Sequence, residues 1–550
     1  MTNNKFDYKK QNSKSNFRFD AREFSRNDNA SRKNVGDISI NDKGDSYSIV
    51  GVVEKVVQTG GPTIFSVSDG TGVLSLKAFD GAGVRAYPHI DVGDVINAIA
   101  AIEEYNGELE GEVNKITKLI ETEKKEFLER LVKIEKERAK VEVVPFLVQS
   151  PILDKLQERF VKAATEIRLA VIQSRPIIIR HHADADGYSA GYALEKAILP
   201  LVAKQHSAAP KAEWEYYTRA PCNAPMYELD DSIRDTAHSL SNAAKFSNKM
   251  PLVVIADTGS GKEDLLGIKQ GKVHGQDFIV VDHHQFEEDV ISEETLVHIN
   301  PFLVGESGAH FSAGMLCVEL ARLINSDPNL NILQIAAMAG LADRTDNPKV
   351  LKEYLEIANK VGYDEKLLKE IASVIDFVSS KLRFMEAREY IEVLFGEPRA
   401  KQKALVHLLA PHIVKLDAKG LEIAKAAVKV EKIGEVTVQT LSIEENFSRG
   451  FYPKPGRVTG LIHDYAQTSK NLDNVVTLGC MTDAITMRAT DKSNFSVHDL
   501  ISSLDKKIPE AFVEGGGHKN AAGANSYESL RKTINTFKKI LPRLDEFYFD

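Results

Sequence analysis

The sequence predicts an α/β protein in which an N-terminal all-β barrel precedes a parallel-sheet domain. Two patterns predict this fold class. Short alternating runs with Gly and Asp turns between them occupy residues 46–118, and continuous aliphatic runs alternate with helical patterns over residues 151–376. The chain of 550 residues also exceeds one compact domain, since a domain usually has about 150 residues.

Composition excludes several classes of protein. Hydrophobic residues make up 43% and charged residues 27%, which excludes collagen-like and wholly disordered chains. Cys222, Cys317 and Cys480 are too few for a disulfide framework, so we expect a reducing, cytoplasmic environment. No apolar run approaches the roughly 18 residues of a membrane span, and the N-terminus lacks the apolar segment of a secretory signal. The net charge of -9 argues against a small, uniformly basic DNA-coating protein.

Residues 1–45 are predicted to form a disordered tail. They are rich in Asn, Ser, Lys, Arg and Asp and poor in aliphatic residues. Such a segment cannot bury enough apolar surface to offset the entropy lost on ordering. Because Met1–Lys33 carries nine Lys or Arg against four Asp or Glu, an arm that touches nucleic acid is the alternative.

Residues 46–118 are predicted to form a small antiparallel barrel. The expected strands are Tyr47–Val57, Thr63–Ser68, Val73–Phe79, Asp94–Ile99 and Leu109–Ile116. The hairpin at 65–72 and the strand entry at 92–96 resemble an OB-fold, so we expect a nucleic-acid-binding domain. Four aromatic side chains are candidates to stack on bases, namely Phe65, Phe79, Tyr87 and Tyr105. The alternative is that half of them fill the barrel core.

Residues 119–150 are predicted to be a helical linker, because Phe127, Leu131 and Ile134 recur at helical spacing among dense mixed charges. Three aliphatic runs follow, at 176–180, 252–256 and 278–281. Runs of this kind, separated by helices, are typical of parallel strands buried on both faces. Parallel sheets bind ligands at the carboxyl ends of their strands.

Acids and imidazoles follow the end of each aliphatic run. They are His181, His182, Asp184 and Asp186 after the first run, Asp257 after the second, Asp282, His283 and His284 after the third, and Asp343 after a later helical stretch. One Asp at a strand end is usually a helix N-cap or a turn residue. So many together would repel one another unless cations lay among them. Oxygen and imidazole ligands without a nearby cysteine suit Mn²⁺ or Mg²⁺, and two such ions can activate water against a phosphoryl group.

These motifs resemble those of the DHH phosphoesterase superfamily. The matching segments are H-x-D-x-D-G at His182–Gly187, I-A-D-T-G at Ile255–Gly259, D-H-H at Asp282–His284, the later Asp343, and G-G-G-H at Gly515–His518. The last of these is similar to the motif of the DHH-associated domain. The resemblance implies a DHH domain over 151–376, a helical connector over 377–430 and a smaller α/β, substrate-binding DHH-associated domain over 431–550. With an N-terminal OB-fold, the combination resembles the archaeal RecJ-like nucleases.

The resemblance also implies a role for each residue of the motifs. Asp257 would bridge two metal ions, His182 and Asp184 would hold one ion, Asp186, His283 and Asp343 would hold the other, His284 would face the scissile phosphate, and Asp282 would orient the imidazoles. Related phosphatases often place a histidine four residues before the first aspartate, where this chain has Arg180. His181 therefore stays an alternative to His182 as the ligand.

Two further features are implied to bind substrate. The backbone of Gly515, Gly516 and Gly517 would approach a phosphate, and His518 would add a donor, the alternative being a tight loop with a packed histidine. Arg488 stands where family members often have an arginine facing the substrate, although a lone arginine on a strand is usually at the surface.

The function implied is that of a hydrolase, a RecJ-like exonuclease that cleaves single-stranded DNA or RNA from an end with two Mn²⁺ or Mg²⁺ ions. The expected partners are single-stranded nucleic acid and replication or repair proteins. One alternative is a phosphatase for short oligonucleotides or phosphoadenosine phosphate. Another is a replisome scaffold related to RecJ, which the presence of all the motif acids disfavours.

Overall fold

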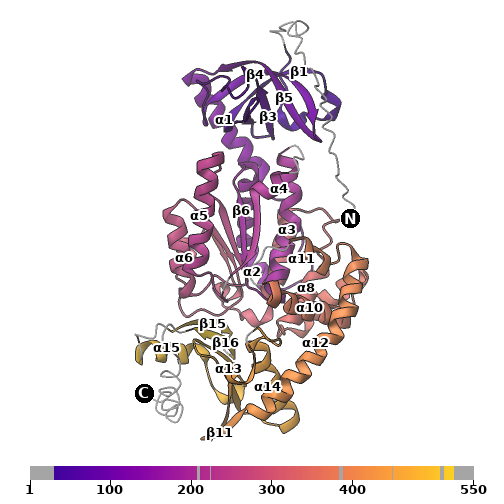
Figure 1. The fold of residues 1–550 in the computed structure, drawn as a ribbon, viewed down its shortest axis with the longest axis vertical. Coiled ribbons are helices and arrows are strands. Elements are labelled where there is room, and N and C mark those ends of the chain that lie inside the picture. The colour runs from indigo at the N-terminus through magenta and orange to yellow at the C-terminus, as the bar shows by residue number, and fades with distance from the viewer. Residues whose placement is uncertain are drawn as a thin grey trace, which may run out of the picture.

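The computed structural model describes residues 30–206, 211–222, 224–382, 388–448, 450–507, 509, 513–518 and 520–525. The chain forms a barrel, a parallel-sheet unit and a C-terminal sheet, in that order from top to bottom of Figure 1. In the described part of the chain, no helix combines the length and the apolar character that crossing a membrane requires.

The N-terminal barrel is closed, with the strand order β1-β2-β3-β5-β4. Its strands are β1 (Ser46–Gln58), β2 (Thr63–Ser68), β3 (Val73–Ala78), β4 (Val95–Tyr105) and β5 (Glu108–Lys118). Alternate residues of each strand point inward and form the core, and this period of two confirms the predicted barrel.

Residues 30–45 differ from the predicted disordered tail, since they pack on the barrel. Val35 is buried, and its backbone N–H donates to Asp69 Oδ2 at 2.9 Å. Asp42 is also buried and accepts from Tyr47 Oη at 2.8 Å. A polar composition therefore did not prevent order here, because the barrel supplies both a hydrophobic site and hydrogen-bond partners. Residues 1–29 of the predicted tail lie outside the described residues.

A helix, α1 (Glu121–Ala139), connects the barrel to the rest of the chain, where the helical linker was predicted. Its Phe127 and Leu131 pack against Val95 of the barrel. Across the junction, Lys249 pairs with Glu54 at 3.1 Å. The barrel is thus held against the parallel-sheet unit by both apolar and ionic contacts.

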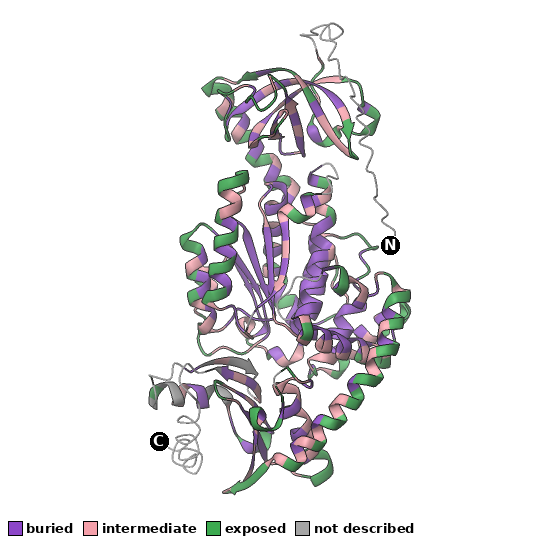
Figure 2. Cartoon of the chain, viewed as in Figure 1, coloured by how far each residue is buried: buried purple, intermediate pink, exposed green. Residues whose placement is uncertain are grey.

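The central sheet has five parallel strands in the order β10-β9-β8-β6-β7. They are β6 (Ile177–His181), β7 (Tyr217–Pro221), β8 (Leu252–Ala256), β9 (Asp277–Val281) and β10 (Val297–Ile299). The three predicted aliphatic runs form β6, β8 and β9, and these strands are buried almost throughout (Figure 2). This confirms the predicted parallel sheet.

Helices pack on this sheet and on one another around it. They are α2 (Pro151–Ile172), α3 (Ala185–Gln205), α4 (Ala212–Tyr216), α5 (Leu229–Phe246), α6 (Lys262–Val273), α7 (Ala313–Ile324), α8 (Ile335–Ala342), α9 (Pro348–Lys360), α10 (Glu365–Leu382) and α11 (Arg388–Leu394). The boundary expected at residue 376 falls inside α10, which packs in the core of this unit. A long helix, α12 (Arg399–Ala427), then leads to the C-terminal sheet (Figure 1).

The C-terminal sheet has six strands in the order β11-β12-β13-β14-β16-β15. Its elements are β11 (Lys429–Ile433), β12 (Val436–Ser442), α13 (Ile443–Asn446), α14 (Pro455–Lys470), β13 (Val475–Cys480), β14 (Ala484–Ala489), α15 (Val497–Lys507), β15 (Glu514–His518) and β16 (Ala521–Asn525). Helix α14 packs on β13 and β14, which gives this smaller unit its α/β character.

The barrel and the C-terminal sheet lie at opposite ends of the parallel-sheet unit (Figure 1). Helix α3 begins at the carboxyl ends of the strands and ends at Gln205, whose Oε1 accepts from Arg138 at 3.2 Å. Arg138 also donates to the Gly70 carbonyl of the barrel. The 21 residues of α3, at about 1.5 Å each, therefore separate the strand ends from the barrel by about 30 Å.

Arg180, the last residue but one of β6, points into a buried ion-pair network. Its Nε donates to Asp235 Oδ2 at 3.0 Å, and its Nη1 donates to the Pro221 carbonyl at 3.1 Å and lies 3.4 Å from Asp231. All three charged side chains are buried. Arg180 thus joins β6 to α5 and does not join the acids at the strand ends.

Replacing Arg180 by Met should lower the free energy of unfolding by about 3–5 kcal/mol, because two carboxylates would stay buried without their partner. Urea unfolding measures this change. The control is Arg344→Met, since the Arg344 side chain is 76% exposed and its pair with Asp464 should contribute about 0–1 kcal/mol. Equal losses for both variants would contradict the structural role of Arg180.

Candidate metal centre

The carboxyl ends of β6, β8 and β9 bring acids and imidazoles together, as parallel strands predict. Two groups of side chains have ligand atoms within 4.8 Å of one another: His182, Asp184 and Asp257, and Asp257, His283 and His284. The two groups share Asp257. The structure therefore offers two adjacent sites with one carboxylate between them.

Asp257 is held between the two groups by its backbone. It follows β8 directly, its N–H donates to the Val281 carbonyl at 2.9 Å, and its φ is +60°. This left-handed conformation is uncommon for a residue with a side chain, and such residues cluster at functional sites. The carboxylate lies 3.6 Å from His182 Nδ1 and 3.4 Å from His283 Nε2.

The side chains of the neighbouring residues His181 and His182 point in different directions. His182 Nδ1 lies 3.0 Å from Asp184 Oδ2, inside the first group. His181 is fully buried, with its Nδ1 2.7 Å from the His182 carbonyl oxygen and its ring against Tyr188. Burial and the Arg219 charge lower the pKa of His181 to about 3. Of the two candidates, only His182 is therefore placed to hold a metal ion.

Asp186, in the first turn of α3, directs its carboxylate at the N-terminus of α7. Its carboxylate accepts from Ser312 Oγ at 2.8 Å and from the backbone N–H groups of Ala313 and Gly314 at 2.9 and 3.0 Å. A Cβ on Gly314 would come within 2.7 Å of Asp186 Oδ1, so a glycine is needed for this approach. Burial, and then the charges of Asp257 and Asp343, raise the pKa of Asp186 well above its ordinary value.

His283 lies between the carboxylates of the second group. Its Nε2 is 3.4 Å from Asp257 and 3.9 Å from Asp186, whereas Asp343 lies 3.8 Å from Nδ1. Burial alone would lower the pKa of His283, but the charges of Asp343 and Asp257 outweigh it and raise this pKa well above its ordinary value. Asp186 and Asp343 thus lie on different sides of the His283 ring.

His284 is positioned by a neighbouring carboxylate. Its Nδ1 lies 2.8 Å from Asp282 Oδ1, which also accepts the backbone N–H groups of His283 and His284. Asp282 is buried, and the His284 charge holds the pKa of Asp282 below its ordinary value although burial opposes this. Asp282 therefore turns the Nε2 edge of the His284 ring away from itself.

A buried polar group that was not predicted from the sequence supports this motif. Asn300 Nδ2 donates to the His284 carbonyl at 3.0 Å and to Ser260 Oγ at 2.9 Å, and Ser260 Oγ lies 2.9 Å from His298 Nε2. All three side chains are buried. One signal could have identified Asn300, because it is a polar residue directly after the aliphatic strand β10.

The side chains present fit divalent metal ions. Asp257 Oδ2 is buried and has no hydrogen-bond partner among the described residues, which is costly unless a cation approaches it. Burial would lower the pKa of His182, but Asp184 and Asp257 raise it well above its ordinary value. Neither group contains a cysteine, and carboxylate oxygens with imidazole nitrogens suit Mn²⁺ or Mg²⁺ better than structural zinc.

The predicted substrate-binding residues lie on the C-terminal sheet. Arg488, on β14, is half-buried and close enough to Asp343 for that charge to act on it, although burial and Arg344 lower the pKa of Arg488. Gly515, Gly516 and Gly517 form the edge strand β15, not a loop, because they pair with the small residues of β16. Alternate N–H groups of an edge strand face away from its partner strand. The His518 side chain lies outside the described residues.

The four aromatic residues of the barrel fall into two classes. Phe65 is fully buried in the core, which removes it as a stacking candidate, and Tyr87 is half-buried against the same core. Phe79 and Tyr105 are 56% and 59% exposed. The error for Phe65 is explained by alternation, since Phe65 shares the inward face of β2 with Val67.

Comparisons with known proteins agree with this architecture. A family model described as an OB-fold nucleic acid binding domain (tRNA anti-codon) matches residues 47–119. An uncharacterized protein of Methanocaldococcus jannaschii is 35% identical over 525 residues, which cover 90% of this chain and 68% of the relative. A solved structure described as the DHH domain of a member of a ribosomal protein family is 35% identical, with a TM-score of 0.72, over 77% of this chain and 99% of that chain.

RecJ of Thermus thermophilus, solved with Mn²⁺, shares the fold at 18% identity and a TM-score of 0.51, over 76% of this chain and 57% of that chain. This level of identity shows the fold alone. The relatives that are 35% identical extend over most of this chain and include a DHH domain. The protein therefore belongs to the DHH family, with an OB-fold barrel at its N-terminal end and the fold that RecJ shares.

Proposed function

We propose that this protein is a metal-dependent phosphodiesterase that hydrolyses single-stranded DNA or RNA from an end. The observation that carries the proposal is the pair of ligand groups sharing Asp257 at the carboxyl ends of three parallel strands. This pair lies at the end of the parallel sheet that is nearer the C-terminal unit (Figure 1), and Arg344, next to Asp343, forms a 2.9 Å ion pair with Asp464 on α14 of that unit. A strand end lying between the two units would meet acids on one side and Arg488 on the other.

The side chains at the site would have three roles in the reaction, namely metal binding, contact with the attacked phosphate, and binding of that phosphate from the opposite side. His182, Asp184 and Asp257 would hold one Mn²⁺ or Mg²⁺ ion. Asp257 and His283 would hold the other ion, and Asp186 and Asp343, which lie outside the ligand group of Asp257, His283 and His284 but within 4 Å of His283, would complete that site. Two bound ions would supply an activated water and withdraw charge from the phosphoryl group. His284, fixed by Asp282, would face the phosphate that is attacked, and Arg488 and the Gly515–His518 strand would bind the phosphate from the opposite side.

The barrel would bind bases more than phosphates. Residues 46–118 carry five Lys or Arg and ten Asp or Glu, a net charge of -5. Lys77, on the outer face of β3, lies 4.3 Å from the Tyr105 ring and pairs with Glu110. An acidic surface repels phosphates, whereas exposed aromatic rings stack on any base. Because the barrel lies about 30 Å from the strand ends, only a long strand could reach both.

Asp257→Asn should abolish hydrolysis, since this carboxylate is common to both ligand groups. We would follow 5′- and 3′-labelled single strands of DNA and RNA with Mn²⁺, which also identifies the sugar and the end attacked. The control is Asp277→Asn, at the opposite edge of the same sheet, which should cleave at the normal rate. Wild-type cleavage by Asp257→Asn, or by the wild-type protein in excess EDTA, would contradict the proposal.

Binding of Mn²⁺ should release protons, and its affinity should rise with pH. Although burial opposes the change, the neighbouring carboxylates raise the pKa of both His182 and His283, which favours the protonated imidazoles in the metal-free protein. A metal ion binds only the neutral ring and must displace these protons. Titration calorimetry in two buffers of different ionisation enthalpy measures the release. Identical apparent enthalpies in both buffers would show that neither histidine is a ligand.

Replacing Phe79 and Tyr105 together by Ala should weaken binding of a long single strand and spare a dinucleotide. Two lost stacking contacts cost about 2–6 kcal/mol, roughly 30-fold or more in affinity for a strand of about 20 nucleotides. The slope of affinity against salt concentration should not change, because stacking releases no counterions. The control is Tyr390→Ala, an exposed aromatic residue of α11.

Two results would overturn this role of the barrel. An equal loss for the dinucleotide and the long strand would mean that the aromatic pair only supports folding. A flatter salt slope in the variant would mean that the barrel binds phosphates. A wild-type protein that prefers the dinucleotide would instead favour the phosphatase for short nucleotides.

A further inference from the structure

The loop that carries Asp184 is hydrogen-bonded on both sides from distant parts of the chain. The Ala185 N–H donates to Asp376 Oδ1 of α10 at 3.0 Å. The Ala183 carbonyl accepts from Lys454 Nζ at 3.1 Å and from Ser379 Oγ at 3.3 Å. Asp184 is thus fixed through its two neighbours. Its own Oδ1 accepts the Gly187 N–H at 2.9 Å, which caps α3.

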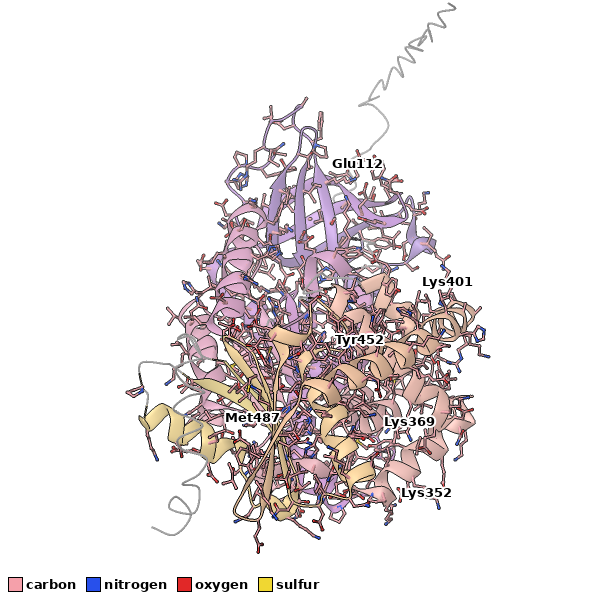
Figure 3. The ribbon with its side chains drawn as sticks, turned by 60° about the horizontal axis from the view of Figure 1, so that its bottom comes forward. Glu112, Lys352, Lys369, Lys401, Tyr452 and Met487 are labelled. Carbon is pink, nitrogen blue, oxygen red and sulfur yellow. The ribbon has the colours of Figure 1, made fainter. Side chains whose placement is uncertain are left out.

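Lys454 belongs to the C-terminal unit, because it is the N-cap residue of α14. Its Nζ also donates to Ser379 Oγ at 3.1 Å, so the ammonium group lies between α10 and the metal-holding loop. Two residues earlier, Tyr452 is buried in the core of the parallel-sheet unit, with its ring 5.0 Å from that of Phe377 (Figure 3). The segment that precedes α14 is therefore anchored against the unit that holds the metal site.

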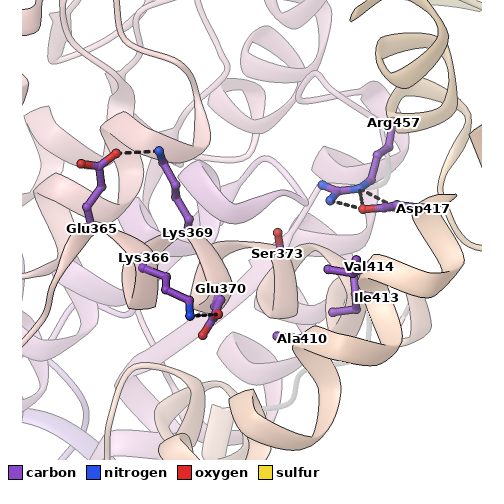
Figure 4. A pocket seen from close by; sticks show the side chains of 10 residues that line it. All are labelled: Glu365, Lys366, Lys369, Glu370, Ser373, Ala410, Ile413, Val414, Asp417 and Arg457. Atoms are coloured by element: carbon purple, nitrogen blue, oxygen red, sulfur yellow. Dashed lines mark hydrogen bonds and ion pairs between the residues drawn. The ribbon is translucent and has the colours of Figure 1, made fainter. Parts of the chain in front are cut away.

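Arg457, one helical turn into α14, makes a second connection. It forms a bidentate ion pair with Asp417 of α12, at 2.9 Å from Nε to Oδ1 and 2.6 Å from Nη2 to Oδ2 (Figure 4). Its Nη1 also lies 3.8 Å from Asp376. This pair lies at the edge of a cleft of about 560 Å³ between α10 and α12. Asp376, which holds Ala185, is thus itself held by a residue of the C-terminal unit.

We propose that Lys454 is a positioning residue that ties the metal-holding loop of His182 and Asp184 to the C-terminal unit. The inference rests on the proposed function, because it concerns one of the two metal sites proposed there. Lys454 does not touch the ligand atoms of that site. It acts through the Ala183 carbonyl, and so through the backbone that aims the Asp184 side chain.

This connection has a thermodynamic consequence. If the C-terminal unit moves away from the strand ends, Lys454 must leave Ala183, and Ser379 alone remains to hold that carbonyl. The first metal site should therefore be strongest when the C-terminal unit is docked. By reciprocity, metal binding at His182 and Asp184 favours the docked position, in which Arg488 faces the site. Substrate binding and metal binding would then support each other.

The ligands of the second metal site, Asp186 and His283, are held by other contacts. The metal affinity of this site should therefore change less when Lys454 is replaced. Asp186 is held by the N–H groups at the start of α7, and His283 Nδ1 lies 3.2 Å from the Gly308 carbonyl. Neither contact involves Lys454, and the ion pair of Arg344, next to Asp343, with Asp464 of the C-terminal unit does not involve it either. A change at Lys454 should therefore separate the two sites in a binding experiment, which a general loss of stability would not do.

The experiment is Mn²⁺ titration of the full-length protein by calorimetry, without nucleic acid. Wild-type protein should bind two ions. Lys454→Met keeps the length of the side chain and removes its charge and its hydrogen bonds. This variant should bind one of the two Mn²⁺ ions with about 10–100-fold lower affinity, as is usual when a residue that holds a metal ligand in place is lost. Lys454→Arg should recover most of that loss, because a guanidinium can also donate to Ala183.

The matched control is Lys492→Met, since Lys492 is an exposed lysine of the same unit that pairs with Asp473. It should bind both ions normally. The Tm of each metal-free variant should stay within about 4 °C of the wild type, as expected for loss of one or two hydrogen bonds.

The outcomes are distinguishable. Wild-type protein that binds no Mn²⁺ would defeat the proposed function itself. Two ions bound by Lys454→Met with wild-type affinity would overturn the role of Lys454 and leave the function intact. Equal weakening of both ions together with a large fall in Tm, or no recovery in Lys454→Arg, would mean that Lys454 is only a structural residue.

Discussion

Electrostatic repulsion at one sheet edge is the constraint on which the rest of this structure depends. Asp184, Asp186, Asp257 and Asp343 converge there, and three imidazoles lie among them. Asp186 and Asp257 are almost completely buried. Buried carboxylates that lie close together cannot all stay ionised without compensation. The fold supplies that compensation at each acid differently.

Asp186 receives the N–H groups of α7, Asp184 has His182 beside it, and the Lys454 ammonium lies nearby. Asp257 and Asp282 each keep a buried oxygen that has no hydrogen-bond partner among the described residues, and Asp257 is the one that both ligand groups share. The unpartnered oxygen of Asp257 therefore lies where a cation held by either group could approach it. The site is therefore best explained as one completed by cations.

The arrangement of the three units follows from where this edge lies. The parallel strands direct their carboxyl ends toward the C-terminal sheet, and α14 returns Lys454 and Arg457 to the loops at those ends. The barrel lies at the other end of α3, about 30 Å away. Phosphate chemistry and base contact would thus take place at separate surfaces, and the acidic barrel would not compete for the phosphate.

Local patterns made much of this fold predictable. Both ends of the strand at 63–68 were predicted correctly, because apolar and polar residues alternate within it and a Gly-Pro turn directly precedes it. Residues 30–45 and Phe65 were misjudged, because their burial depends on what packs against them. The backbone of Gly515–Gly517 was expected to approach a phosphate, with a tight loop as the alternative. That it forms a strand could not be predicted, since glycine permits both conformations and only the pairing with β16 decides between them.

In the candidate site, too, some residues could be predicted from their neighbours in the sequence, and others depend on the tertiary fold. Acids at strand ends could be recognised because each stands directly after an aliphatic run, and Asn300 could have been found in the same way. The contacts that hold these acids in place could not be recognised from the sequence. Lys454 lies 271 residues from Ala183 in the sequence, and Ser312 lies 126 residues from Asp186. Nothing in the residues around Lys454 or Ser312 indicates such a contact, because only the tertiary fold brings the two segments together.

The most direct test of the central claim is the anomalous diffraction signal of manganese in crystals grown with Mn²⁺. The structure predicts two anomalous peaks, one on each side of the Asp257 carboxylate, with His182 and Asp184 next to one peak and His283 next to the other. A single peak at another place, or no peak at the ends of β6, β8 and β9 at saturating Mn²⁺, would contradict a two-metal phosphodiesterase.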